Sequence, residues 1–177
     1  MPPSIQANLT PREAFARFQE LLLGEAPDAA TATATADLYA DDVVIEIPFA
    51  RPGMPSRFDG RASFAAFAAT QRASLPARFE EFRNVVIHDT ADPEVIIAEY
   101  DLAGTVTTTT TVRQASQPFV LVLRVRAGRI VHLREYQNVL GIAAELGQLP
   151  ELLASLGRDR GLGLGLGREP ADVSTDI

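Results

Sequence analysis

Arg129-Ile-Val-His-Leu-Arg-Glu-Tyr-Gln-Asn-Val-Leu-Gly-Ile-Ala-Ala-Glu-Leu-Gly147 carries the strongest structural signal in this chain of 177 residues. The stretch follows an Ala-Gly turn signal and begins with the period of two that is typical of a β-strand. The alternation predicts one strand face made of Ile130, His132, Arg134 and Tyr136, and an opposite face made of Val131, Leu133, Glu135 and Gln137. After Asn138 the apolar residues recur at helical spacing. Glu135 is therefore either an outward solvated charge or an acid held in a pocket.

Composition excludes several classes of function. The net charge of −7 and the absence of a Lys or Arg cluster argue against nucleic-acid binding. The chain has no cysteine and only two histidines, so we expect no disulfide, no metal site and no cofactor. No apolar run is long enough to span a bilayer, and the N-terminus lacks a signal-peptide pattern. We therefore expect no membrane association and a cytoplasmic location.

The first half of the chain reads as helical. Thr10-Pro11-Arg12-Glu13 has the pattern of a capped helix start, and Gly24 stops the helix that follows. An Ala/Thr-rich stretch leads into a short helix predicted near Asp37 to Ala40, and a third helix is predicted over about 62–74. The second half reads as strands, and this order predicts an α+β fold with a mainly antiparallel sheet.

The predicted strands are separated by clear turn signals, and 114–117 reads as a polar connection. The strands are expected at 43–48, 80–89, 94–110, 118–127 and 129–138. We expect a loose lead-in over 1–9, one folded domain over 10–156, and a flexible Gly/Leu-rich tail over 157–177.

Three acids are candidates for chemistry. Glu99 and Asp101 alternate on one strand, so they share a face, and Glu135 lies on another strand of the same sheet. If that face is concave, repulsion and burial raise the pKa of at least one acid toward neutrality, as a general acid or base requires. The alternative is that the strands turn these acids to solvent, or that arginines on neighbouring strands neutralise them.

Three motifs carry a family resemblance. They are His88-Asp89-Thr90-Ala-Asp92-Pro93, Ala98-Glu99-Tyr100-Asp101 and Arg134-Glu135-Tyr136-Gln-Asn138-Val139. In this order they resemble the SnoaL-like polyketide cyclases of the nuclear-transport-factor-2-like superfamily, and the last two resemble the phenazine-biosynthesis isomerase branch most. The resemblance covers about residues 10 to 150. It implies a cone-shaped, cystatin-like or ketosteroid isomerase-like fold, in which a curved, mainly antiparallel sheet and three N-terminal helices enclose a pocket.

The resemblance also implies roles for the acids. The final-strand glutamate of the phenazine branch acts as acid and base, and Glu135 matches it. Asp101 and Glu135 match two acids of limonene epoxide hydrolase, where Glu99 replaces an arginine. The residues implied as catalytic are thus Glu135, Asp101 and Glu99. The positions that ketosteroid isomerase uses are apolar here, and Phe67 replaces a histidine of the phenazine branch.

A small hydrophobic or aromatic, polyketide-like ligand is the implied partner. The residues expected to contact it are Phe18, Tyr39, Ile47, Phe49, Met54, Phe67, Leu121, Leu133 and Gln137. The first hypothesis is a cofactor-free cyclase or isomerase of secondary metabolism. The alternatives are a non-catalytic ligand-binding or interaction module and an epoxide hydrolase. The outer sheet face, which carries Val120 and Val122 with His132 and Arg134, is expected to form a homodimer.

Overall fold

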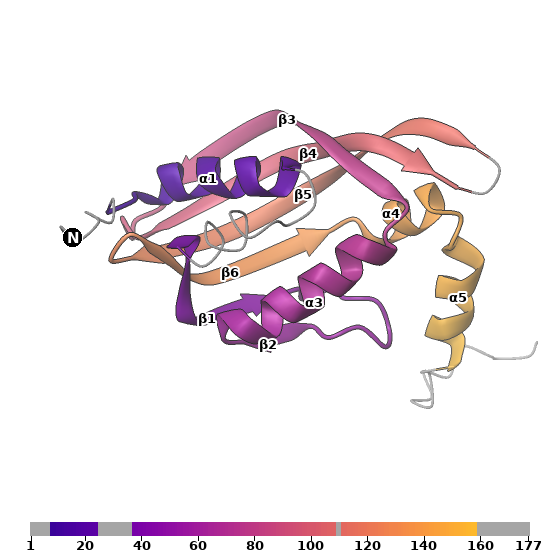
Figure 1. Ribbon diagram of the computed structural model, residues 1–177, viewed down its shortest axis with the longest axis horizontal. Coiled ribbons are helices and arrows are strands. Elements are labelled where there is room, and N and C mark those ends of the chain that lie inside the picture. The colour runs from indigo at the N-terminus through magenta and orange to yellow at the C-terminus, as the bar shows by residue number, and fades with distance from the viewer. Residues whose placement is uncertain (1–7, 25–36, 109–110, 159–177) are drawn as a thin grey trace, which may run out of the picture.

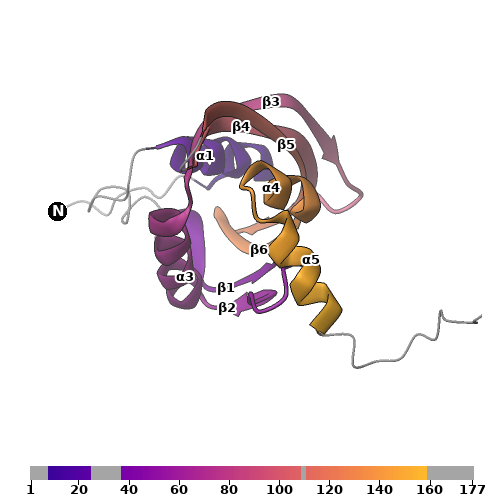
Figure 2. The same cartoon turned by 90° about the vertical axis from the view of Figure 1, so that its right-hand side faces the viewer.

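A strongly curved sheet forms the body of the protein. The computed structural model describes residues 8–24, 37–108 and 111–158, and Figures 1 and 2 show the sheet curling around helices α1 and α3. The strand order is β2-β1-β6-β5-β4-β3. The strands are β1 (Tyr39–Glu46), β2 (Arg57–Asp59), β3 (Ala77–Asp89), β4 (Val95–Thr107), β5 (Val112–Arg126) and β6 (Arg129–Gln137). All neighbours pair antiparallel except β1 and β6, which pair parallel, so the predicted α+β class is confirmed.

Helices cover the inner face and one end of the sheet. They are α1 (Pro11–Leu23), α3 (Arg61–Ser74), α4 (Val139–Glu145) and α5 (Leu149–Arg158). The predicted capping box starts α1: the Thr10 amide donates to Glu13 Oε2 at 2.8 Å, and the Glu13 amide donates to Thr10 Oγ1 at 3.3 Å. One side of α1 buries Ala14, Phe15 and Phe18 against strands β3 to β6. None of the described helices is both long and apolar enough to cross a membrane.

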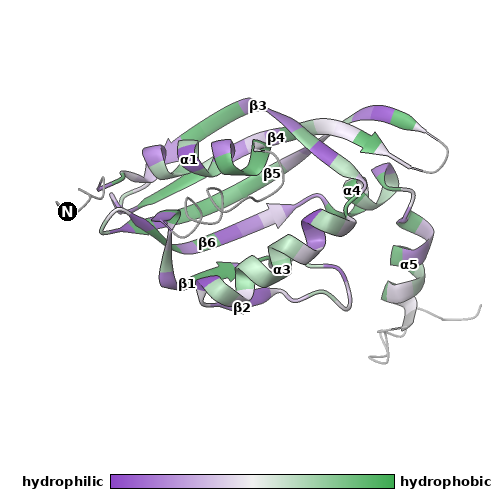
Figure 3. Ribbon diagram, in the orientation of Figure 1, coloured by the Kyte–Doolittle hydropathy of each residue, from purple (hydrophilic) through white to green (hydrophobic). Residues whose placement is uncertain are grey.

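Strand register separates an inner face from an outer face. Three rows of paired residues run across β4, β5 and β6 on the inner face: Ile96, Leu123 and Leu133; Ala98, Leu121 and Glu135; Tyr100, Phe119 and Gln137. The alternate residues between these rows face outward. Figure 3 shows apolar colour along β5 and hydrophilic colour over much of β6. Strand β6 is therefore the most polar central strand, although β1 and β5 flank it on both sides.

A bulge corrects the predicted faces of β6. Arg124 pairs with His132, but the next residue of β5, Val125, pairs with Ile130, which leaves Val131 as the extra residue. Ile130 is therefore fully buried on the inner side with Leu133. The prediction that Ile130 shares a face with His132 is wrong, while the alternation from His132 onward is as predicted.

Two predicted elements are also corrected. Asp37 and Leu38 are helical, as predicted, but strand β1 begins at Tyr39, so the extension of this helix to Ala40 is wrong; the preceding Ala/Thr-rich stretch over 25–36 lies outside the described residues. The polar connection over 114–117 is wrong because these residues lie inside β5 and pair with 102–105 of β4. Long hairpin pairing overrides their polar composition. Helix α5 continues to Arg158, and the rest of the predicted tail, like residues 1–7, lies outside the described residues.

Gly104 allows strand β3 to lie unusually close to strand β4. A Cβ atom added at Gly104 would collide with the backbone carbonyl oxygen of Arg78, which side-chain movement cannot relieve. We expect Gly104→Ala to lower the free energy of unfolding by about 1–3 kcal/mol, measured by urea denaturation. The matched control is Gly157→Ala in α5, where nothing lies within 4 Å and where alanine favours the helix. Equal stabilities of the two variants would contradict the prediction.

Candidate functional site

Glu135 is a carboxylate on the inner face of the sheet. It pairs with Leu121 of β5, which is fully buried, and follows buried Leu133 by one inward position. Burial raises the pKa of Glu135, and the hydrogen bond from Gln137 Nε2 to Glu135 Oε1, at 3.0 Å, opposes the rise. The Glu135 side chain nevertheless keeps part of its surface accessible. An acid that is deep in the protein yet reachable is suited to proton exchange with a bound molecule.

Two buried tyrosines accompany Glu135. Burial and the nearby charge of Glu135 both raise the pKa of Tyr39 and of Tyr100. The Tyr100 ring stacks on Phe119 with centroids 5.5 Å apart and also contacts Phe15. Tyr39 lies on β1, with its ring 6.0 Å from that of Phe64 on α3. The inner face thus combines one carboxylate and two phenols within an aromatic core.

Glu99 and Asp101 do not join this group. On β4 the inward positions are Ala98 and Tyr100, so both acids point to the outer face. Glu99 Oε1 lies 3.0 Å from His88 Nε2, and Asp101 Oδ2 accepts a hydrogen bond from Asn84 at 2.6 Å. The prediction that these acids share a surface with Glu135 is wrong, because the phase of alternation on β4 is opposite to the one assumed. The apolar pattern of Ala98, Tyr100 and Leu102 was the signal that indicates the inward face, and it would have identified Tyr100.

The predicted contact residues divide between several places. Phe18, Leu121 and Leu133 are buried in the core, and Ile47 packs against it. Phe67 packs on Phe58, with ring centroids 4.6 Å apart. These residues are available as apolar walls of the inner face.

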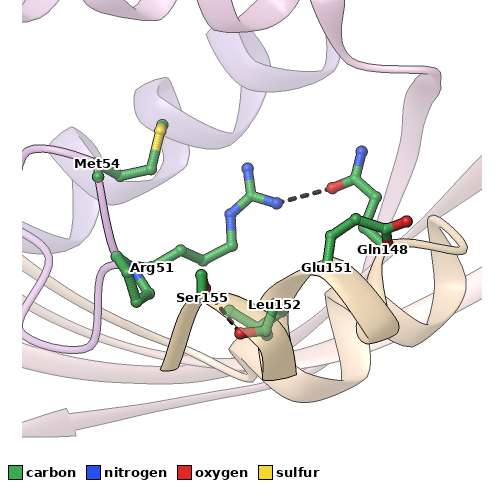
Figure 4. A pocket seen from close by; sticks show the side chains of 8 residues that line it. Arg51, Met54, Gln148, Glu151, Leu152 and Ser155 are labelled. Atoms are coloured by element: carbon green, nitrogen blue, oxygen red, sulfur yellow. Dashed lines mark hydrogen bonds between the residues drawn. The ribbon is translucent and has the colours of Figure 1, made fainter. Parts of the chain in front are cut away.

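Phe49 and Met54 lie elsewhere. Phe49 is 62% exposed and contacts the outward-facing Tyr136, with ring centroids 5.6 Å apart, so its prediction as a wall of the interior is wrong. Met54 lines an open pocket of about 360 Å³ between the β1–β2 loop and α5 (Figure 4). There Arg51 Nη1 donates to Gln148 Oε1 at 2.7 Å.

An ionic cluster occupies the outer face of β1 and β6. Glu46 Oε2 lies 2.8 Å from His132 Nε2 and 2.7 Å from Arg134 Nη2, while Arg57 Nη1 lies 3.0 Å from Glu46 Oε1. Hydrogen bonds from His132 and then Arg134 lower the pKa of Glu46 to about 2. These residues border an open groove of about 380 Å³. Within the described part of the chain, no group of three or more His, Cys, Asp or Glu side chains is arranged to hold a metal ion.

Comparison with known proteins agrees with this architecture. Residues 12–133 match the SnoaL-like domain family. The chain is 33% identical over 111 residues to an uncharacterized PhzA/B-like protein of Pseudomonas aeruginosa, covering 63% of this chain and 75% of that protein. A crystal structure of a presumed isomerase from Bacillus subtilis matches with a TM-score of 0.65 and 25% identity, covering 78% of this chain and 93% of the other.

A presumed polyketide cyclase from Pseudomonas putida shares the fold. Its crystal structure matches with a TM-score of 0.59 and 20% identity, covering 77% of this chain and 98% of the other. Together these matches confirm the predicted resemblance and the predicted type of curved α+β fold.

Glu46 should stabilise the fold in a pH-dependent way. We expect Glu46→Gln to lower the free energy of unfolding by about 1 kcal/mol at about pH 7, because three cationic or ionisable partners lose their shared anion. The pKa of Glu46 is lowered from 4.5 to about 2 by folding. A lowered pKa gives stability that is present above pH 4.5 and lost as the pH falls toward about 2.

The difference between the wild type and Glu46→Gln should therefore shrink across this acid range, as measured by denaturant unfolding. Glu99→Gln is the control, because its side chain is 57% exposed beside His88 and its loss should cost less than about 0.5 kcal/mol. A loss of stability in Glu46→Gln that does not change with pH, or that is no larger than the loss in Glu99→Gln, would refute the stabilising role of Glu46.

Proposed function

Because the chain belongs to the SnoaL-like domain family, we propose that it is a cofactor-free cyclase or isomerase of small-molecule metabolism in which Glu135 transfers a proton. The observation that supports this most is the placement of Glu135: a partly accessible carboxylate on the inner face, with its pKa raised by burial. Such an acid binds a proton more tightly than a solvated carboxylate does, which makes it a stronger base toward a substrate.

The proposed chemistry conserves both atoms and electrons. In an isomerisation, the Glu135 carboxylate removes a proton from one substrate carbon, the C–H electron pair enters the adjacent π system, and the proton returns to a second carbon. In a cyclisation, the resulting carbanion attacks a carbonyl carbon of the same molecule, and the new alkoxide takes the proton back. Both reactions need orientation of the substrate, which the apolar walls from Phe18, Leu121 and Leu133 supply.

A hydrophobic, aromatic or polyketide-like compound of secondary metabolism is the proposed substrate class. The interior is lined by aromatic and aliphatic side chains, and one structural neighbour is a presumed polyketide cyclase. The cytoplasmic location predicted from the sequence stays part of this proposal. Epoxide hydrolysis is not retained, because it requires Asp101 beside Glu135 and the two lie on opposite faces of the sheet.

A non-catalytic binding module is the second candidate. One observation favours it: within the described residues, neither histidine lies with Glu135, since His88 and His132 pair with Glu99 and Glu46 on the outer face. Glu135 would then act as a hydrogen-bond partner of the ligand and not as a proton carrier.

Glu135→Gln separates the two candidates. The change keeps the shape and a hydrogen bond but removes proton transfer, so turnover of a confirmed substrate should fall by about 10²–10⁴-fold with little change in ligand affinity. Substrates are sought first by thermal-shift screening of polycyclic aromatic and polyketide-like compounds, and product formation is followed by chromatography.

Glu99→Gln is the matched control for this experiment. It makes the same chemical change in an acid on the outer face, and its turnover should equal that of the wild type. Unchanged turnover in Glu135→Gln would reject Glu135 as the proton carrier. A change of affinity alone would favour the binding module.

A homodimer through the outer face is the proposed assembly. Val86, Glu99 and Val120 form one row of paired residues on this face, and Val86 and Val120 are 50% and 36% exposed. Exposed apolar side chains on a sheet face favour cover by a second copy.

Light scattering during size exclusion tests the assembly. The wild type should have twice the mass of the 19.1 kDa chain, and Val120→Glu should give a monomer, because it replaces an exposed apolar side chain of this row with a second carboxylate beside Glu99. Glu81→Gln, which changes an exposed residue in an ion pair with Arg83, is the control and should stay dimeric. A wild-type monomer at micromolar concentration would reject the proposal.

A further inference from the structure

We infer that the open pocket between the β1–β2 loop and helix α5 binds a small zwitterion with a short aliphatic group, such as a free aliphatic amino acid. Arg51 holds the carboxylate of this ligand, and Glu151 holds its ammonium group. Met54 and Leu152 contact the aliphatic part. The site is separate from the proposed reaction, because Glu135 does not line this pocket.

The pocket contains two opposite charges that are not paired. Most arginines in the described part of the chain form an ion pair with an acid. Among the same residues, neither Arg51 nor Glu151 has an ion-pair partner, and the guanidinium of Arg51 donates only to the neutral amide of Gln148, at 2.7 Å. A guanidinium has five N–H donors, so others remain for a carboxylate. A ligand that carries both charges can pair with both side chains at once.

The β1–β2 loop holds Arg51 in a defined position. The Met54 amide donates to the Arg51 carbonyl oxygen at 2.9 Å, and Gly53 has a φ of +79°, so a tight turn places glycine where a positive φ is required. The Ile47 amide donates to the Ser56 carbonyl oxygen at 2.8 Å and closes the base of the loop. The cation is therefore presented by an ordered turn, which lowers the entropic cost of binding a ligand.

The connection between α4 and α5 fixes the opposite wall. The Gln148 amide donates to the Ala143 carbonyl oxygen at 2.7 Å, and the Gly147 amide donates to that of Ala144 at 3.2 Å, which together form a Schellman motif. The Leu152 amide then donates to the Gln148 carbonyl oxygen at 3.0 Å and begins α5. The first turn of α5, which carries the acid of the pocket, is thus anchored to the end of α4.

The size and lining of the pocket select a small aliphatic ligand. Its volume of about 360 Å³ is at the lower end of the range for ligand pockets. Met54 and Leu152, which is 6% exposed, supply the apolar contacts, and no aromatic side chain of the described residues lines the pocket (Figure 4). A simple carboxylate would leave Glu151 unpaired, and a simple amine would leave Arg51 unpaired, so the zwitterion is favoured over both.

Three compounds with one aliphatic skeleton test the inference: L-leucine, 4-methylpentanoate, which lacks the ammonium group, and 3-methylbutylamine, which lacks the carboxylate. The chain has only two methionines, Met1 and Met54, so carbon-13 labelling of the methionine methyl groups places an NMR probe in the pocket. Met54→Leu identifies the signal. We expect L-leucine to shift it with a Kd below about 1 mM at about pH 7. The amine should bind at least about tenfold more weakly, and the acid at least about threefold more weakly.

Two variants should change the affinities in opposite ways. Arg51→Met should weaken L-leucine by about tenfold or more, because it removes the partner of the carboxylate, and should leave 3-methylbutylamine unchanged. Glu151→Gln should weaken L-leucine by about two- to fivefold, as for an exposed ion pair, and should not weaken 4-methylpentanoate. General damage to the pocket would weaken all three compounds, so this crossed pattern separates recognition of charge from loss of structure.

Arg17→Met is the matched control. It makes the same chemical change in an exposed arginine of α1 that is paired with Glu20, and it should bind all three compounds like the wild type. Circular dichroism checks that each variant is folded; if Arg51→Met is not, the three affinities of Glu151→Gln decide the test. Three results would overturn the inference: no shift of the Met54 signal at about 10 mM L-leucine, equal affinity for the three compounds, or wild-type affinity for L-leucine in folded Arg51→Met.

Discussion

The carboxylate of Glu135, on the inner face of β6, loses hydration on folding, and no cation among the described residues lowers its raised pKa. The compensation among the described residues is one hydrogen bond from Gln137. Glu135 stays inside because β6 is hydrogen bonded to β1 and β5, and a slip of one residue would turn Leu133 outward as well. Apolar pairing along the same strand therefore holds an acid in an unfavourable place. The raised pKa of Glu135 and the proposed chemistry both follow from this constraint.

Two glutamates on adjacent strands show how the face of the sheet determines chemistry. Glu46 and Glu135 lie on β1 and β6, which are paired, but Glu46 points outward and Glu135 inward. Outside, His132 and Arg134 lower the pKa of Glu46 to about 2, so it is a permanent anion that ties the strands together. Inside, burial raises the pKa of Glu135, so its charge responds to its surroundings. The same side chain is structural on one face and available for reaction on the other.

How well the sequence predicts which residues face inward differs from strand to strand. On β6 the alternation from His132 to Gln137 correctly identifies Glu135 as an inward residue, because buried Leu133 fixes the phase. On β4 apolar residues occur at both odd and even positions, so the alternation alone does not show which set of residues points inward. The prediction that the acids belong to the inward set is wrong. The bulge at Val131 and the pairing of 112–117 into β5 arise from contacts between strands, which no local pattern contains.

The outward position of Glu99 and Asp101 on β4 also narrows the type of reaction that we propose. Turning Glu99 and Asp101 outward brings Tyr100 inward, so the described inner face holds one carboxylate, Glu135, and two phenols whose pKa values are raised. Hydrolysis generally uses one group to activate water and another to protonate the leaving group, as the paired carboxylates of glycosidases do. Isomerisation and cyclisation conserve the proton, so a single carboxylate can remove it and return it. The arrangement of the inner face therefore favours rearrangement of carbon–carbon and carbon–hydrogen bonds within one substrate over cleavage by water.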